Sequence, residues 1–463
     1  MYVQIPPEPP APGFQPVRIV EFDLGAPIPD LHARCTAGGL VYGRCLALVR
    51  LHAEPLALVE VELQEGSLSA GVLASRVWPT VADRVTRHFE RDQLEVPNKL
   101  PPGGLATSTL LACVAERDDF LARAPALTVL IPSRERPERL ARCLDSILAC
   151  EYPPDRLTLI VVDNAPLTDG TRLLVRDYAR RADIRYLRED ATGSASARNR
   201  GLREVQTDLV AMTDDDTVVD RWWLLELART FGEFPQAAAV SGLLVPMELD
   251  SPPQLWFEQF GGFGRGFDRR VFDLDEHRPA DEPLYPWTAG VFGTANNFAF
   301  RTAALREIGA FDPALGNGTP ALGGVDTEIM LRTIITGHTI VYEPRALVHH
   351  AHRVDYAALC RQIYGYGSGL VAVWLKTLTT NPTLTLDFAR KAVPGLRFAI
   401  STKSSKNSRK RADYPSELTK LELRGMLYGP IAYARSRRRY GWHAVPRAKL
   451  PPRRPRAADS ARG

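Results

Sequence analysis

The sequence of 463 residues lacks any apolar run long enough to cross a membrane. Its longest candidate, residues 369–375, falls far short of the ~18–20 residues that a spanning helix needs. The first residues are rich in proline and have neither the basic start nor the apolar stretch of a secretory signal. We therefore expect no membrane span and no signal peptide, and we interpret residues 1–16 as a disordered leader.

Paired cysteine motifs are also missing. Zinc knuckles and disulfide frameworks both depend on short, repeated cysteine spacings, so neither is predicted. Buried thiols in a reducing cytoplasm are the simpler interpretation. The six cysteines are Cys35, Cys45, Cys113, Cys143, Cys150 and Cys360.

The chain has little net charge, +4 in total, but this charge is unevenly distributed. Residues 391–463 contain 19 Lys and Arg against 4 Asp and Glu, a local balance of +15, which leaves −11 for residues 1–390. Tyrosines and a tryptophan are interleaved with the basic residues, a pattern that suits an anionic membrane surface. A solubilising, disordered tail is the alternative. The tail has no nucleic-acid recognition motif, so no specific nucleic acid is expected.

The length predicts two to four domains at ~100–200 residues each. Apolar runs at 45–51 and 56–63 indicate a strand pair, and a helical pattern follows at 81–92. We expect a small α+β N-terminal module with its linker over residues 17–105, because Pro and Gly cluster at 96–104. A main domain over 106–375 and a basic extension, helical or disordered, over 376–463 complete the prediction.

The pattern of the main domain predicts alternating strands and helices. Apolar runs predict strands at 127–131, 157–162, 184–187 and 208–213, with helices between them. Continuous apolar strands joined by crossover helices are typical of a doubly wound, mostly parallel α/β sheet. Ligands of such sheets bind at the carboxyl ends of the strands, where Pro132, Asp163 and Asp214 fall.

Three consecutive carboxylates, Asp214, Asp215 and Asp216, follow the fourth predicted strand directly. Like charges this close repel one another, so a compensating cation is favoured. Oxygen ligands suit Mg²⁺ or Mn²⁺, either of which can bridge to phosphate oxygens. The alternative is a solvated acidic turn that caps the helix beginning near Trp222.

Two further segments carry weaker signals. Asp163 ends the second strand and either accepts hydrogen bonds from a base or ribose, or simply forms a turn with Asn164. Arg198 and Arg200 follow a run of small residues at a predicted helix start. These guanidinium groups either reach a pyrophosphate or lie on the helix surface.

Four motifs occur in order, at residues 130–136, 161–164, 197–201 and 214–216. Together they resemble the nucleotide-sugar-binding half of a family 2 glycosyltransferase, non-processive and bacterial in type, over residues 127 to about 375. The resemblance implies a GT-A fold and a metal-binding D-x-D pair formed by Asp214 and Asp216. The residues that it places on the nucleotide sugar are Pro132, Ser133, Arg134, Asp163, Arg198, Asp214, Asp215 and Asn297.

The resemblance also assigns the catalytic base. The usual Gly-Glu-Asp motif stands here as Gly324-Val325-Asp326, so Asp326 would deprotonate the acceptor. Val325 in place of Glu removes one acceptor contact. The alternative role of Asp326 is capping of the helix that follows.

Three of the nine histidines lie within residues 349–352. Neutral imidazole binds Mn²⁺-like ions, and the resembled family often uses one late histidine as a metal ligand. His350 and His352 are the candidates; histidines that bond backbone carbonyls are the alternative.

We therefore expect inverting, Mn²⁺- or Mg²⁺-dependent transfer of one sugar from a nucleotide-diphosphate sugar, preferably a UDP-sugar, to a hydroxyl of a lipid-linked or small-molecule acceptor. Such an enzyme would serve cell-envelope glycan, glycolipid or natural-product glycosylation, in the cytoplasm or on the inner face of the membrane. Processive synthesis is not expected, because the Gln-x-x-Arg-Trp motif is missing. A sugar-phosphate nucleotidylyltransferase would need a glycine-rich loop after residue 131, and a non-catalytic sugar-binding module would not need Asp326.

Overall fold

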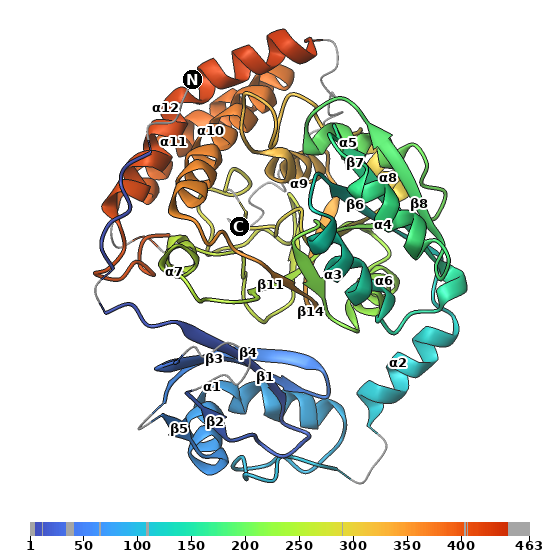
Figure 1. Ribbon diagram of the computed structural model, residues 1–463, viewed down its shortest axis with the longest axis vertical. Helices are drawn as coiled ribbons and strands as arrows, with labels where there is room; N and C mark the ends of the chain where they lie inside the picture. The colour runs from blue at the N-terminus through green and yellow to red at the C-terminus, as the bar shows by residue number, and fades with distance from the viewer. Residues whose placement is uncertain are drawn as a thin grey trace, which may run out of the picture.

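A computed structural model describes residues 5–11, 13–33, 41–63, 66–107, 111–288, 290–401, 404 and 406–442. Figure 1 shows a small N-terminal module in blue below a larger body, with the C-terminal helices in orange and red along one side of that body. Helix α2 (Ala112–Ala122) lies between the module and the body.

The N-terminal module is a short sheet covered by one long helix. β1 (Val17–Asp23) runs parallel to β3 (Arg44–Leu51), which forms an antiparallel hairpin with β4 (Glu54–Glu62). A second pair joins β2 (Leu31–His32) to β5 (Ser67–Leu68).

Helix α1 covers this sheet and spans Ala70–Arg91, so the predicted helix at 81–92 is too short. Leu73, Val77 and Val81 are buried at helical spacing, and their burial continues the helix through Pro79. Proline is disfavoured inside helices, which is why the local pattern suggested a later start.

The central sheet has nine strands among the described residues, in the order β10-β14-β11-β13-β9-β6-β7-β8, with β12 beside β14. The predicted parallel set is confirmed: β6 pairs in parallel with β7 and β9, and β7 with β8. β13 runs antiparallel between β9 and β11. The strands are β6 (Leu127–Ser133), β7 (Leu157–Asn164), β8 (Ile184–Glu189), β9 (Leu209–Met212), β10 (Thr217–Val219), β11 (Ala237–Pro246), β12 (Arg270–Phe272), β13 (Phe298–Arg301) and β14 (Thr339–His350).

Helices bury both faces of this sheet. In β6, Leu130 packs into one core and its neighbours Val129 and Ile131 into the other, which explains the continuous apolar runs. The helices of the body are α3 (Pro137–Leu148), α4 (Gly170–Tyr178), α5 (Ser194–Leu202), α6 (Trp223–Glu233), α7 (Pro252–Phe260), α8 (Thr302–Ile308) and α9 (Val325–Ile335), with the 3₁₀ turn η1 (Pro154–Arg156).

The C-terminal part forms three helices, α10 (Tyr356–Thr380), α11 (Thr385–Ile400) and α12 (Ser416–Tyr440). The short 3₁₀ turn η2 (Pro382–Leu384) lies between α10 and α11. α12 packs along α10, and its Arg437 forms a fully buried ion pair with Asp312 of the main body. The described part of the basic extension is therefore helical and shares a core with the body, while residues 443–463 lie outside the described residues.

The described part of the leader has neither helix nor strand, and its Ile5 and Ala11 pack against a cluster formed with α7, α10 and α12. Among the described residues, no helix combines the length and the apolar character that crossing a bilayer requires. The five described cysteines are all free thiols, and Cys35 lies outside the described residues.

Candidate functional site

The three consecutive carboxylates occupy a closed turn between β9 and β10. Thr217 Oγ1 donates to the carbonyl oxygen of Asp214 at 2.8 Å and lies 2.8 Å from Thr213 Oγ1. This turn points the three acidic side chains in different directions, so each has its own surroundings.

Asp215 faces the loop that follows β6. Its Oδ2 accepts a hydrogen bond from Ser133 Oγ at 2.9 Å, and its Oδ1 lies 3.3 Å from Arg136 Nη1. The side chain is buried, so it ties the predicted nucleotide-binding loop 132–136 to the acidic turn. Arg134, in the middle of this loop, is exposed.

Asp216 lies among basic groups from two separate segments. Arg136 and Arg139 approach Oδ2 from the start of α3, at 3.5 and 3.9 Å, and Arg353 approaches it from beyond β14, at 3.5 Å. Burial opposes ionisation, but the basic side chains outweigh it and lower the pKa of Asp216. The sequence analysis overlooked all three arginines as site residues.

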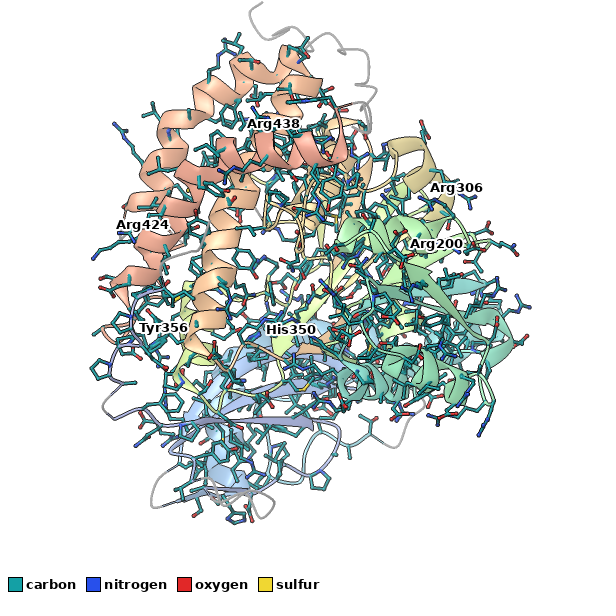
Figure 2. The ribbon with its side chains drawn as sticks, turned by 45° about the horizontal axis from the view of Figure 1, so that its top comes forward. Arg200, Arg306, His350, Tyr356, Arg424 and Arg438 are labelled. Atoms are coloured by element: carbon teal, nitrogen blue, oxygen red, sulfur yellow. The ribbon has the colours of Figure 1, made fainter. Side chains whose placement is uncertain are left out.

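Asp214 pairs with Arg198 of α5, whose Nη2 donates to Oδ1 at 2.6 Å. Burial, opposed by Arg198 but reinforced by Asp216, Asp215 and Asp326, raises the pKa of Asp214 to about 7. Arg198 is buried in the middle of the helix, whereas Arg200 pairs with Glu204 and points away from the site (Figure 2). The structure thus separates the two arginines that the motif placed together.

His350 reaches the acidic turn because β14 pairs with β10, with His350 opposite Thr217. Its Nε2 lies 3.5 Å from Asp216 Oδ1, and Figure 2 shows the residue in the middle of the molecule. Burial lowers the pKa of His350 to about 3, so the ring is neutral.

His352 contacts the His350 ring on the side away from Asp216. Its Nε2 lies 2.7 Å from Glu258 Oε1, and its Nδ1 lies 3.1 Å from His350 Nδ1. A carboxylate only accepts, so in the neutral rings His352 Nε2 and then His350 Nδ1 carry the protons. His350 Nε2 is left with a lone pair that faces Asp216. Both nitrogens of His352 are engaged by protein groups, so the geometry favours His350 of the two predicted histidines.

Asp163 is fully buried at the end of β7. Tyr186 donates to its Oδ2 at 2.9 Å, while Oδ1 has no hydrogen-bond partner among the described residues. Burial raises the pKa of this carboxyl group. An unpaired buried acceptor at a strand end is consistent with a ligand contact.

Asn297 does not face the site, which contradicts its predicted contact with the nucleotide sugar. Its amide nitrogen donates to the carbonyl oxygens of Leu243 and Ala346, and its oxygen accepts from Trp223 Nε1. These hydrogen bonds lie in the core, where Asn297 is fully buried. Its neighbour Asn296, in the turn before β13, lines the cleft instead.

Asp326 lies in the first turn of α9, one residue after the helix begins. Its Oδ1 accepts from the Thr327 amide at 2.9 Å and its Oδ2 from the Ala295 amide at 3.4 Å. The preceding Gly324 has a φ of 92° and lies against α10, so a side chain at that position would be strained. Val325, at the usual Glu position, is buried.

A cleft of about 1180 Å³ unites these groups. Of the predicted residues, Arg198, Asp214, Asp216, Asp326 and His350 line it. The remaining predicted residues do not line it and are Pro132, Ser133, Arg134, Asp163, Asp215, Asn297 and His352. Helices α10, α11 and α12 form its far wall, which local sequence patterns did not indicate.

Comparison with known proteins identifies the class. Residues 125–364 match the family described as "Glycosyltransferase like family 2", so the chain belongs to this glycosyltransferase family and is an enzyme with the expected GT-A type of α/β fold. The resemblance seen in the motifs is confirmed.

Named relatives are similar over about half of the chain. The pre-mycofactocin glycosyltransferase of Mycobacterium tuberculosis is 29% identical over 50% of this chain and 43% of its own length. The glucosyl-dolichyl phosphate glucuronosyltransferase of Haloferax volcanii is 26% identical over 49% of this chain and 68% of its own length. Glycosyltransferase AglE of the same organism is 31% identical over 54% and 75%.

Two solved structures are similar to the chain at low sequence identity. The mannosyltransferase PcManGT from Pyrobaculum calidifontis, in complex with GDP-Man and Mn²⁺, covers 68% of this chain and 73% of its own, with 19% identity and a TM-score of 0.42. S. aureus TarS 1-349, in complex with UDP-GlcNAc, covers 68% and 92%, with 13% identity and a TM-score of 0.43.

Proposed function

We propose that this chain is a divalent-metal-dependent, inverting glycosyltransferase that moves one sugar from a nucleotide-diphosphate sugar, preferably a UDP-sugar, to an acceptor hydroxyl. One observation carries the proposal: Asp214, Asp216, His350 and Asp326 all open onto one cleft. A cation-binding group and a separate carboxylate are the two components that such a transfer requires.

The donor set fits a divalent cation. The His350 Nε2 atom lies 3.5 Å from Asp216 Oδ1, and the Asp214 side chain lines the same cleft. Asp214, Asp216 and His350 would hold Mn²⁺ or Mg²⁺, an ion that stabilises a departing diphosphate.

The surrounding arginines suit the diphosphate of the donor. Arg136 and Arg198 line the cleft on either side of the acidic turn, and Arg353 lines it beyond β14. Guanidinium groups bind phosphate oxygens through paired hydrogen bonds. Asp163, with its unpaired Oδ1, is the proposed contact of the base or ribose.

Asp326 is the proposed base. It accepts the proton of the acceptor hydroxyl while that oxygen attacks the anomeric carbon from the face opposite the diphosphate, which inverts the configuration. The bond between the anomeric carbon and the diphosphate oxygen breaks, and the diphosphate leaves with that electron pair on the side of the arginines. Two backbone amides hold the Asp326 carboxylate at the start of α9, where the helix dipole also favours its charge.

The far wall of the cleft suits an acceptor that is apolar and anionic. Trp287, Trp374 and Phe388 provide aromatic surface, and two basic residues, Lys391 and Arg409, line the same cleft. We propose a lipid-linked phosphate as the acceptor, in line with the name of the Haloferax volcanii relative. A small-molecule acceptor, as the name of the Mycobacterium relative suggests, is the second candidate.

The outer face of α12 is the proposed contact with an anionic membrane. Arg424, Leu427, Ile431, Arg435 and Arg438 are all exposed at helical spacing, and Figure 2 shows Arg424 and Arg438 on the outside of the molecule. Leu427 is 81% exposed. Apolar and basic residues on one helix face are typical of interfacial helices.

Two alternatives are less consistent with the chain. A nucleotidylyltransferase would need glycine where Pro132 to Arg136 stand, and a sugar-binding module would not need Asp326 in the cleft. Thermal-shift measurements with UDP-, GDP- and dTDP-sugars, each with Mn²⁺ and with a chelator, test the proposal. We expect one nucleotide sugar to raise the melting temperature only with metal. Equal shifts in the chelator would contradict metal dependence.

A further inference from the structure

Four metal-binding side chains converge in the N-terminal module, away from the cleft. They are His52, His88, Asp92 and Cys113, and one ligand atom from each lies within 4.8 Å of all the others. We propose that these four residues bind a Zn²⁺ ion. None of them belongs to the catalytic site described above.

The spacing of the four atoms fits a tetrahedral ion. His52 Nδ1 lies 2.9 Å from His88 Nε2 and 3.7 Å from Cys113 Sγ, and His88 Nε2 lies 3.5 Å from Asp92 Oδ2. Zinc bonds of about 2.0–2.1 Å to nitrogen and about 2.3 Å to sulfur place tetrahedral ligand atoms about 3.3–3.7 Å apart. Small rotations of the two imidazoles would bring the shortest distance into this range.

An unpaired buried oxygen points into the cluster. The Asp92 side chain is 0% exposed, and its Oδ2 has no hydrogen-bond partner among the described residues. Arg91 Nε lies 3.4 Å from the other oxygen, Oδ1, and so leaves Oδ2 for the cluster. A thiolate and a carboxylate together balance the two charges of Zn²⁺, which makes the filled site neutral and suited to burial.

Zinc binding at this site would release the proton of the Cys113 thiol, because the thiolate is the ligand.

Surrounding groups hold the ligands in place. Glu54 Oε2 lies 3.3 Å from His88 Nδ1, the carboxylate contact that orients metal-bound histidines. His52 and Ala53 form the β3–β4 turn with φ values of 49° and 70°, both left-handed. Asp23 accepts hydrogen bonds from both turn amides, at 3.0 and 2.6 Å, and so keeps His52 aimed at the cluster.

The position of Cys113 gives the site a structural role. Cys113 opens α2, and α2 contacts the main body through Arg117, which lies 3.4 Å from Glu226 of α6. Zinc would tie α2 to the end of α1 and to the β3–β4 turn, and so fasten the module to the catalytic body. Four protein ligands leave no open position, as in structural rather than catalytic zinc sites.

Metal analysis of the untagged, purified protein tests the site. We expect one zinc per wild-type chain after dialysis against metal-free buffer, and loss of that zinc in Cys113→Ala and in Asp92→Asn. Cys45→Ala removes a different buried thiol, and Asp216→Ala removes the cleft ligand, so both should retain the zinc. Zinc that is lost in Asp216→Ala but kept in Cys113→Ala would overturn the proposal.

Cobalt substitution of the wild-type chain gives a test that needs no variant. Co²⁺ in this site should show tetrahedral visible bands and a thiolate-to-cobalt charge-transfer band, absent from Cys113→Ala and present in Asp216→Ala. Glu54→Gln should keep the spectrum and weaken zinc affinity about 10–100-fold. A wild-type protein with neither zinc nor a tetrahedral cobalt spectrum would show a metal-free hydrogen-bond network and refute the site.

Discussion

At the scale of single residues, the proposed mechanism gives different tasks to two carboxylates of the cleft. Asp216 is surrounded by basic groups that lower its pKa, so it stays charged and can bind a cation. Asp326 lies apart from these groups, on the first turn of α9, where it can accept a proton. Each role therefore predicts a different defect.

We expect Asp326→Asn to lower the transfer rate by about 10²–10⁴-fold, since an amide cannot take the acceptor proton. Donor affinity should remain unchanged, because Asn keeps the shape of the side chain. Transfer assays and donor titration by calorimetry measure the two effects. Full transfer activity in this variant would show that another group is the base.

Asp216→Ala should abolish the metal-dependent part of donor binding, because it removes the carboxylate nearest to His350. The thermal shift that the nucleotide sugar produces with Mn²⁺ should fall to the value seen in chelator. Asp190→Ala removes an exposed carboxylate with a 77% exposed side chain and is the matched control. An undiminished Mn²⁺-dependent shift in Asp216→Ala would remove Asp216 from the metal site.

At the scale of elements, α10 positions the loop that carries Asp326. Gly365 and Gly369 lie against residues 322–324, while Gly367 faces α12, so glycines on two sides of one helix allow two close contacts. The buried Glu328 of α9 pairs with Arg332 and with Lys376 of α10, which fixes the two helices together.

Gly369→Ala tests this packing. The new Cβ would lie 2.5 Å from the Gly323 carbonyl carbon and 2.7 Å from the Gly324 nitrogen, so the loop must move. We expect a loss of about 1–3 kcal/mol in the free energy of unfolding and a lower kcat. In Gly395→Ala of α11 the nearest atoms are 3.9 Å away, so stability should rise by up to about 1 kcal/mol. Chemical denaturation and initial rates measure both; equal behaviour of the two variants would contradict the close packing.

At the scale of the whole molecule, the C-terminal helices complete the cleft and share its core. Arg437 and Asp312 form an ion pair in which both side chains are 0% exposed. Arg437→Met leaves Asp312 buried without its partner and should cost about 3–5 kcal/mol of unfolding free energy. Arg438→Met, at the exposed neighbouring position, should change it by less than about 0.5 kcal/mol. Similar denaturation midpoints for both variants would show that α12 is not part of the folded core.

The outer surface of α12 predicts a response to lipid charge. Vesicles that contain anionic lipid should bind the full chain, and vesicles of neutral lipid should not. Co-sedimentation measures this binding. Arg424→Glu with Arg438→Glu should weaken binding by at least about 2 kcal/mol, or roughly 30-fold, at ~1 kcal/mol for each basic residue near the surface. Arg176→Glu with Arg180→Glu, two arginines at and just beyond the end of α4 with 63% and 77% exposed side chains, is the charge-matched control. Equal loss in the control would indicate a response to net charge alone.

Local patterns predicted much of the body and only part of the site. The apolar runs before Pro132, Asp163 and Asp214 indicated parallel strands, because burial on both faces demands continuous apolar residues. The helix expected at 81–92 was too short, and the donor contact expected of Asn297 disagrees with its place in the core. Tertiary packing stabilises α1 on both sides of Pro79, so the helix continues past the proline. Both the amide nitrogen and the amide oxygen of Asn297 form hydrogen bonds in the core.

The sequence alone determined the α/β alternation, the acidic turn at a strand end and the family of the chain, since these are encoded by neighbours along the chain. Only the tertiary structure decided that His350 meets Asp216, because that contact depends on the pairing of β10 with β14. It also decided that His52, His88, Asp92 and Cys113 share one site. The four residues lie close together because the β3–β4 turn, the end of α1 and the start of α2 meet in the fold. The sequence spacing of the whole set does not indicate this meeting.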